Sequence, residues 1–90
     1  MHARVHLFIE GRVQGVFYRS FTREQAGDFG LSGWVRNLHD GRVEAVFEGP
    51  KERIEQVIVA CQKGPPGARV SHMDISWEPL AGEKGFEIRY

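Results

Sequence analysis

A chain of 90 residues is long enough for one domain with a modest core and too short for two. Twelve basic and twelve acidic side chains give a formal net charge of zero, which argues against a general nucleic-acid binder, and a single cysteine excludes an intrachain disulfide. No apolar run approaches the ~20 residues of a membrane-spanning helix, and the N-terminal residues hold no apolar signal core. We therefore expect a cytoplasmic protein.

The first predicted element is a strand from Arg4 to Glu10, in which three aliphatic residues alternate with more polar ones. The glycine-bearing segment Gly11–Arg19 follows it and leads into a predicted helix. Such a loop can turn backbone N–H groups inward, and a helix N-terminus adds unpaired donors and the positive end of its dipole. With Arg19 as a cation in the first helical turn, the segment predicts a phosphate site.

A helix is predicted from Tyr18 to Phe29 because its apolar residues share one arc, and Gly30 suits its C-terminal end. A strand over Leu31–Leu38, a tight turn at Asp40-Gly41 and a strand over Arg42–Glu48 follow. The clean alternation of the last strand predicts one buried face and one wetter face for this hairpin.

The segment Gly49-Pro50 is predicted to open a second helix, with Pro50 at the first helical position. Apolar residues repeat along this helix at i, i+3, i+4 and i+7, and Gly64–Gly67 ends it. A fourth strand is predicted from Ala68 to Trp77, with a bulge near Ser71-His72 where the alternation slips, and a last short strand over Phe86–Tyr90.

This order, β-α-β-β-α-β plus a short C-terminal strand, predicts a single domain over residues 1–90 with a ferredoxin-like split β-α-β fold of the α+β class. Two helices would cover one face of a mostly antiparallel sheet. The first two strands would then be parallel with the third between them, so that their ends lie ~10 Å apart at one edge. The glycine loop and Asn37 would meet there, whereas the edge that the last strand joins is left open.

Two segments carry a resemblance to a known family. They are Ile9-Glu10-Gly11-Arg12-Val13-Gln14-Gly15-Val16-Phe17-Tyr18-Arg19 and Gly33-Trp34-Val35-Arg36-Asn37, the second followed by Gly41, Val43 and Gly49. With these signatures and the element order, essentially the whole chain resembles the acylphosphatases. The resemblance implies hydrolysis of small-molecule acyl phosphates to a carboxylate and inorganic phosphate, without a metal or other cofactor.

The resemblance also implies roles for individual residues. Arg19 would bind the phosphoryl group, and Asn37 would position the attacking water. The cradle would be completed by backbone N–H groups of the loop, those of Gln14, Gly15, Val16, Phe17 and Tyr18. The chemistry is consistent with such a site, because the leaving carboxylate has a parent acid with a pKa of about 4 and needs no proton donor.

Other interpretations of the same residues stay open at this point. Without the resemblance, Arg19 would be a surface arginine at a helix start and Asn37 a turn residue. Arg12 either attracts anions or is a solvated loop charge. The four histidines show no metal-ligand spacing and are expected to be solvated, and Cys61 is expected in the core.

Another class of function is also considered. Ferredoxin-like sheets serve as modules that bind RNA or small anionic ligands, and Phe8 and Trp34 lie off the predicted core face, where bases could stack. Glu10, Glu44 and Glu48 share that face and argue against nucleic acid. A phosphate-binding domain without activity, or a part of a larger carbamoyl-transfer protein, is a third interpretation. We expect a monomeric enzyme without nucleic-acid or membrane partners.

Overall fold

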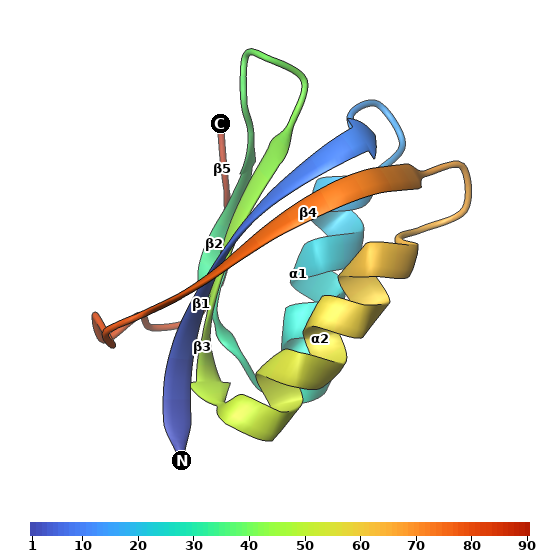
Figure 1. Ribbon diagram of the computed structural model, residues 1–90. Coiled ribbons are helices and arrows are strands. Elements are labelled where there is room, and N and C mark those ends of the chain that lie inside the picture. The colour runs from blue at the N-terminus through green and yellow to red at the C-terminus, as the bar shows by residue number, and fades with distance from the viewer.

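Two helices cover one face of a five-stranded sheet in the computed structural model, which describes residues 1–90 (Figure 1). The elements are β1 (His2–Arg12), α1 (Tyr18–Phe29), β2 (Ser32–Asn37), β3 (Val43–Pro50), α2 (Lys51–Lys63), β4 (Arg69–Glu78) and β5 (Phe86–Arg89). The strand order is β4-β1-β3-β2-β5. This confirms the ferredoxin-like α+β fold. Neither helix has the length and the apolar composition that a membrane span requires.

The direction of the strands decides what meets at each end of the sheet. Both β1 and β2 pair with β3 in antiparallel fashion, so they are parallel to each other with β3 between them, as predicted. The last strand, β5, pairs in parallel with β2 and so joins the edge beyond it. The carboxyl ends of β1, β2 and β5 therefore lie at one end of the molecule, which is the upper end in Figure 1.

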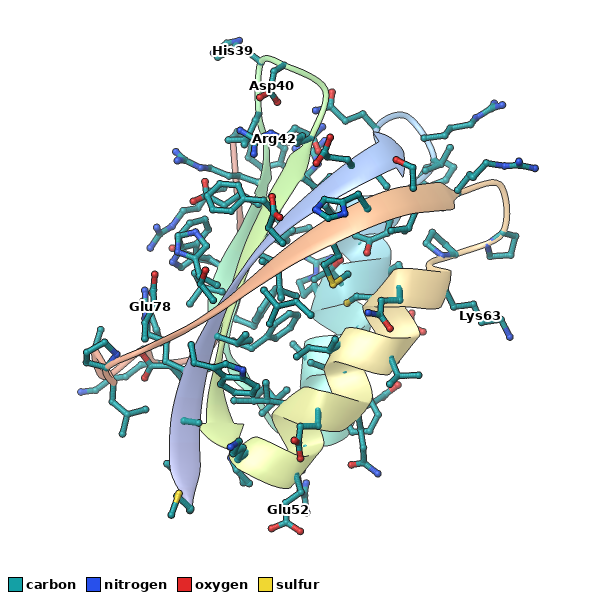
Figure 2. All side chains as sticks on the ribbon, in the orientation of Figure 1. His39, Asp40, Arg42, Glu52, Lys63 and Glu78 are labelled. Carbon is teal, nitrogen blue, oxygen red and sulfur yellow. The ribbon has the colours of Figure 1, made fainter.

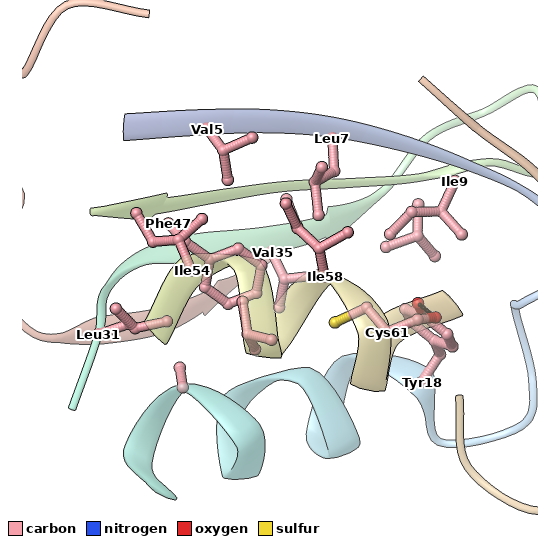
Figure 3. Close-up of a cluster of buried hydrophobic side chains, with 14 of the residues drawn as sticks. Val5, Leu7, Ile9, Tyr18, Leu31, Val35, Phe47, Ile54, Ile58 and Cys61 are labelled. Atoms are coloured by element: carbon pink, nitrogen blue, oxygen red, sulfur yellow. Dashed lines mark hydrogen bonds between the residues drawn. The ribbon is translucent and has the colours of Figure 1, made fainter. Parts of the chain in front are cut away.

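The core lies between the helices and the sheet (Figure 3). The alternating residues of β1 and the predicted stripe of α2 meet there and are fully or almost fully buried. The residues that Figure 3 labels are Val5, Leu7, Ile9, Tyr18, Leu31, Val35, Phe47, Ile54, Ile58 and Cys61. The interior position predicted for Cys61 is confirmed.

The first strand is longer than predicted, which removes two residues from the glycine loop. It extends through Gly11 and Arg12, which pair with β4. Gly11 has a φ of 128°, and a Cβ placed there would lie 2.1 Å from the carbonyl oxygen of Arg69. Glycine is thus required here because β4 packs closely against the backbone. The register between β1 and β4 shifts at this point and leaves Ser71 unpaired, which confirms the predicted bulge. Placing Gly11 and Arg12 in the loop was wrong.

Pro50 also differs from the prediction, because it closes β3 and precedes α2 as the N-cap residue. Its φ of −58° is compatible with a helix, but its ψ of 129° is extended. The helix begins at Lys51, whose N–H donates to the carbonyl oxygen of Met1.

The predicted wetter face of β3 is in fact covered. Glu44 and Glu48 are only 5% and 7% exposed. The connection from β4 to β5 has to cross from one sheet edge to the other, and it does so over this face, at the left in Figure 1. The N–H groups of residues 81–83 donate to the Glu48 carboxylate over 2.9–3.1 Å. Both ring nitrogens of His6 lie against carboxylates, those of Glu44 and Glu78, so the solvated position expected for His6 was wrong.

Candidate active site

The loop between β1 and α1 presents a row of backbone N–H groups that have no partner in the protein. Gly15 and Phe17 both have positive φ, 74° and 62°, and Phe17 passes directly into the right-handed helix. When residues of positive and negative φ alternate in this way, successive backbone N–H groups point toward one place. In α1, the first residue whose N–H donates to a backbone carbonyl oxygen is Phe21, and its acceptor is the carbonyl oxygen of Phe17. The N–H groups of residues 14–20 donate to no protein acceptor and are free to bind an anion.

All but one of these residues line a hollow of about 230 Å³ at the carboxyl ends of β1 and β2. Its lining residues are Val13, Gln14, Gly15, Phe17, Tyr18, Arg19, Ser20 and Asn37. The structure thus brings Arg19 and Asn37 to one cavity, where the strand order predicted they would meet. Of the five residues whose amides were predicted to form the cradle, only Val16 does not line the hollow; it packs partly against the core.

Arg19 is half-buried, and its guanidinium group forms no ion pair. It lies over the ring of Tyr90, whose centroid is 4.9 Å from the Arg19 Cζ atom. The parallel pairing of β5 with β2 brings Tyr90 to this end of the molecule. The aromatic ring therefore orients the guanidinium group of Arg19, and no carboxylate neutralises its positive charge.

The side-chain carbonyl oxygen of Asn37 is buried and accepts no hydrogen bond from the protein. It is the one buried side-chain polar atom in the molecule without a partner. An unpaired buried acceptor costs about 1–3 kcal/mol, so native proteins rarely retain one without a use for it. At the wall of the hollow, this oxygen is suited to accept a hydrogen bond from a small donor such as water.

The side chain of Gln14 links the loop to the β2–β3 turn. Its Nε2 donates to the carbonyl oxygens of Leu38 at 2.8 Å and Arg42 at 2.9 Å. The turn itself closes by the N–H of Gly41 donating to Leu38, with Gly41 at a φ of 96°. Figure 2 shows Asp40 and Arg42 at this tip, beside His39. The sequence predicted a role only for the backbone N–H of Gln14 and not for its side chain. The predicted meeting of the loop and the hairpin was the one feature that could have indicated this contact.

Known proteins resemble this chain over nearly its whole length. The family model described as Acylphosphatase matches residues 5–88. The chain belongs to the acylphosphatase family. It is 52% identical over 89 residues to an acylphosphatase of Haloarcula marismortui, covering 99% of this chain and 98% of that protein. It is 53% identical over 87 residues to an acylphosphatase of Rubrobacter xylanophilus, covering 96% and 79%.

A solved structure agrees as well. The crystal structure of acylphosphatase from Bacillus subtilis superposes with a TM-score of 0.95 at 35% sequence identity, covering the whole of both chains. The acylphosphatase resemblance that the two sequence signatures carry is thereby confirmed in sequence and in fold.

Neither of the titratable side chains in the hydrophobic core, Cys61 and Tyr18, is available as an acid, a base or a nucleophile. Burial raises the pKa of the Cys61 thiol to about 12. Burial also raises the pKa of the Tyr18 hydroxyl, which donates to the carbonyl oxygen of Cys61. The residues that line the hollow include no aspartate, glutamate, histidine or cysteine. What the hollow offers is backbone hydrogen-bond donors, the cation of Arg19 and the amide side chains of Gln14 and Asn37, of which that of Gln14 already donates to the β2–β3 turn.

One group of side chains has the donor atoms for a metal ion. Glu10, His72 and Asp74 offer ligand atoms that all lie within 4.8 Å of one another. They meet because β1 pairs with β4, which the spacing of histidines along the chain does not reveal. His72 and Asp74 are exposed and bonded to each other at 2.8 Å, which raises the pKa of His72. None of the three lines the hollow between the loop and Asn37.

Proposed function

We propose that this protein hydrolyses acyl phosphates, with the phosphoryl group held by Arg19 and loop amides and the attacking water held by Asn37. The activity follows from membership of the acylphosphatase family. Relatives in this family are about 50% identical to the chain and align with nearly all of it. The residue roles rest on one observation. An arginine without an acidic partner, unpaired N–H groups and the unpaired Asn37 oxygen all border one small hollow.

The reaction is a displacement at phosphorus. A water oxygen bonds to phosphorus as the bond from phosphorus to the carboxyl oxygen breaks, and the electron pair of that bond leaves on the carboxylate. The departing carboxylate accepts no proton at neutral pH, since its parent acid has a pKa of about 4. The proton of the water passes to a phosphoryl oxygen of the substrate, because no side chain around the hollow can take it.

The residues around the hollow suit this chemistry. The transition state of phosphoryl transfer is loose and carries its charge on peripheral oxygens, so catalysis consists mostly of positioning and electrostatic stabilisation. The planar fork of Arg19 can bond two of these oxygens at once, and the loop amides can bond the others. Asn37 has too little basicity to deprotonate water, but its carbonyl oxygen can orient one for attack.

The proposal takes the substrate to be a small molecule and the protein to be a monomer in the cytoplasm, without nucleic-acid or membrane partners. Zero net charge supports the absence of nucleic acid. An RNA-binding sheet also needs free aromatic faces. Trp34 is only 8% exposed, and the guanidinium groups of Arg36 and Arg89 lie 5.5 and 4.5 Å from its ring centroid. We expect no retention of single-stranded RNA at low salt.

The decisive experiment treats the purified protein with a chelator and compares benzoyl phosphate with p-nitrophenyl phosphate. We expect cleavage of the first and little cleavage of the second. Isotopically labelled water should place the label in inorganic phosphate and none in benzoate, because attack occurs at phosphorus. Metal-dependent cleavage of the monoester, or label in benzoate, would contradict the proposal.

A further inference from the structure

Phe17 lines the hollow and is 83% exposed, so it forms part of the outer rim, or mouth, of the hollow. From its position and conformation, we propose that its ring is the contact for the acyl half of the substrate, and that it favours acyl phosphates with an aromatic or bulky apolar acyl group. This inference rests on the proposed function and adds the class of acyl group to it.

The backbone of Phe17 gives the first reason. Its φ of 62° lies in the left-handed region, which a bulky side chain rarely adopts, and it is the one residue other than glycine with positive φ. The loop has a second left-handed position, and glycine occupies it: Gly15, with a φ of 74°. A glycine or asparagine at position 17 would adopt the same turn with less strain. The turn alone therefore does not account for a phenylalanine there.

The surroundings of the ring give the second reason. Phe17 belongs neither to the core nor to the hydrophobic residues packed against it. Its ring also has no aromatic or cationic partner in the protein. Packing within the fold thus gains nothing from this side chain, which exposes its apolar surface beside the place where the substrate binds. A strained residue that serves neither turn nor core is typical of a functional position.

The size of the hollow gives the third reason. At about 230 Å³ it is smaller than the ~300–1,000 Å³ of sites that enclose a drug-sized ligand. The phosphoryl group fills the inner part, against the loop amides and Arg19, so a bulky acyl group has to extend out through the mouth. Phe17 lies on that path, and no acidic side chain lines the hollow, so an apolar group there would desolvate no carboxylate. An acyl group that covers the ring removes apolar surface of both partners from water.

The inference can be tested by comparing kcat/KM for benzoyl phosphate with kcat/KM for acetyl phosphate. The phosphoryl group is the same in both, so the ratio of the two values reports the acyl contact. We expect Phe17→Gly and Phe17→Asn, which both tolerate the turn, to lower this ratio about tenfold, the usual value of a modest apolar contact. Phe17→Tyr, which keeps a ring, should preserve the ratio.

Trp77→Ala is the matched control, because Trp77 is another exposed aromatic residue and does not line the hollow. It should leave the ratio at the wild-type value. Loss of activity on both substrates in equal proportion in the Phe17 variants would mean that the ring only supports the loop, and would overturn the inference. So would an unchanged ratio. Failure of the wild type to cleave either substrate would overturn the proposed function itself, and this inference with it.

Discussion

The side-chain amide of Gln14 donates to the carbonyl oxygen of Leu38 at 2.8 Å, and so joins two segments that are 24 residues apart in the sequence. Leu38 directly follows Asn37, and Gln14 belongs to the run of unpaired amides in the loop. This contact sets the spacing between the side of the hollow that would hold the phosphoryl group and the side that would hold the water.

Gln14→Ala should therefore lower kcat by about tenfold or more, since a small displacement of a positioned group is enough to slow attack. The backbone amide of residue 14 is kept, so competitive inhibition by inorganic phosphate should change much less than kcat. Steady-state kinetics with phosphate as an inhibitor measure both quantities. Equal weakening of phosphate binding would show that Gln14 shapes the cradle and does not position the water.

Arg19→Ala should remove turnover of an acyl phosphate, by about 10³–10⁵-fold, the range found for a well-placed arginine in phosphoryl transfer. Thermal unfolding should change little, because the Arg19 guanidinium group forms no ion pair and lies over the ring of Tyr90, the last residue of the chain. Arg23→Ala, on the exposed side of the same helix, is the control and should keep wild-type activity. Near-normal activity of Arg19→Ala would refute the role of this residue.

Asn37→Ala should lower kcat about 10²-fold through loss of the positioned water, while phosphate inhibition persists. Replacing an asparagine that has a structural role lowers stability, whereas Asn37→Ala should not. The carbonyl oxygen of Asn37 has no partner, so its removal lifts a penalty, and the melting temperature should not fall. Calorimetry on the same preparation decides this, and a fall in both kcat and melting temperature would indicate a structural role.

Local patterns in the sequence were enough to predict the core and the meeting of the two halves of the site. Strict alternation identified the buried face of β1, and the order of elements required β2 to lie parallel to it, which brought Asn37 to the loop. What local patterns missed depends on contacts between distant segments. Gly11 looks like a loop glycine until the register of β4 shows a carbonyl group against it.

The burial of Glu48 is the clearest case of such a long-range effect. Its side chain alternates with core residues as a solvent-facing residue would. Sequence periodicity does not reveal that the β4–β5 connection crosses this face. Three N–H groups of that connection donate hydrogen bonds to the Glu48 carboxylate. Arg4 adds a guanidinium group at 2.6 Å. Burial alone would raise the pKa of Glu48, but the N–H of Ala81 and the Arg4 guanidinium outweigh it and hold the pKa below its usual value.

Glu48→Gln should cost about 3 kcal/mol of unfolding free energy, because one amide oxygen cannot accept all the donors that the carboxylate now accepts. The unfolded chain takes up the Glu48 proton first as pH falls, since the folded pKa lies below the ordinary 4.5. The stability that Glu48 provides is complete above that pH and is lost as pH falls through the folded-state pKa. Denaturant unfolding measured between neutral pH and pH 3 should therefore show a shallower acid decline in Glu48→Gln. Glu87→Gln, from an exposed pair with Arg89, should keep the wild-type profile, and an equal decline in all three proteins would show that other carboxylates cause it.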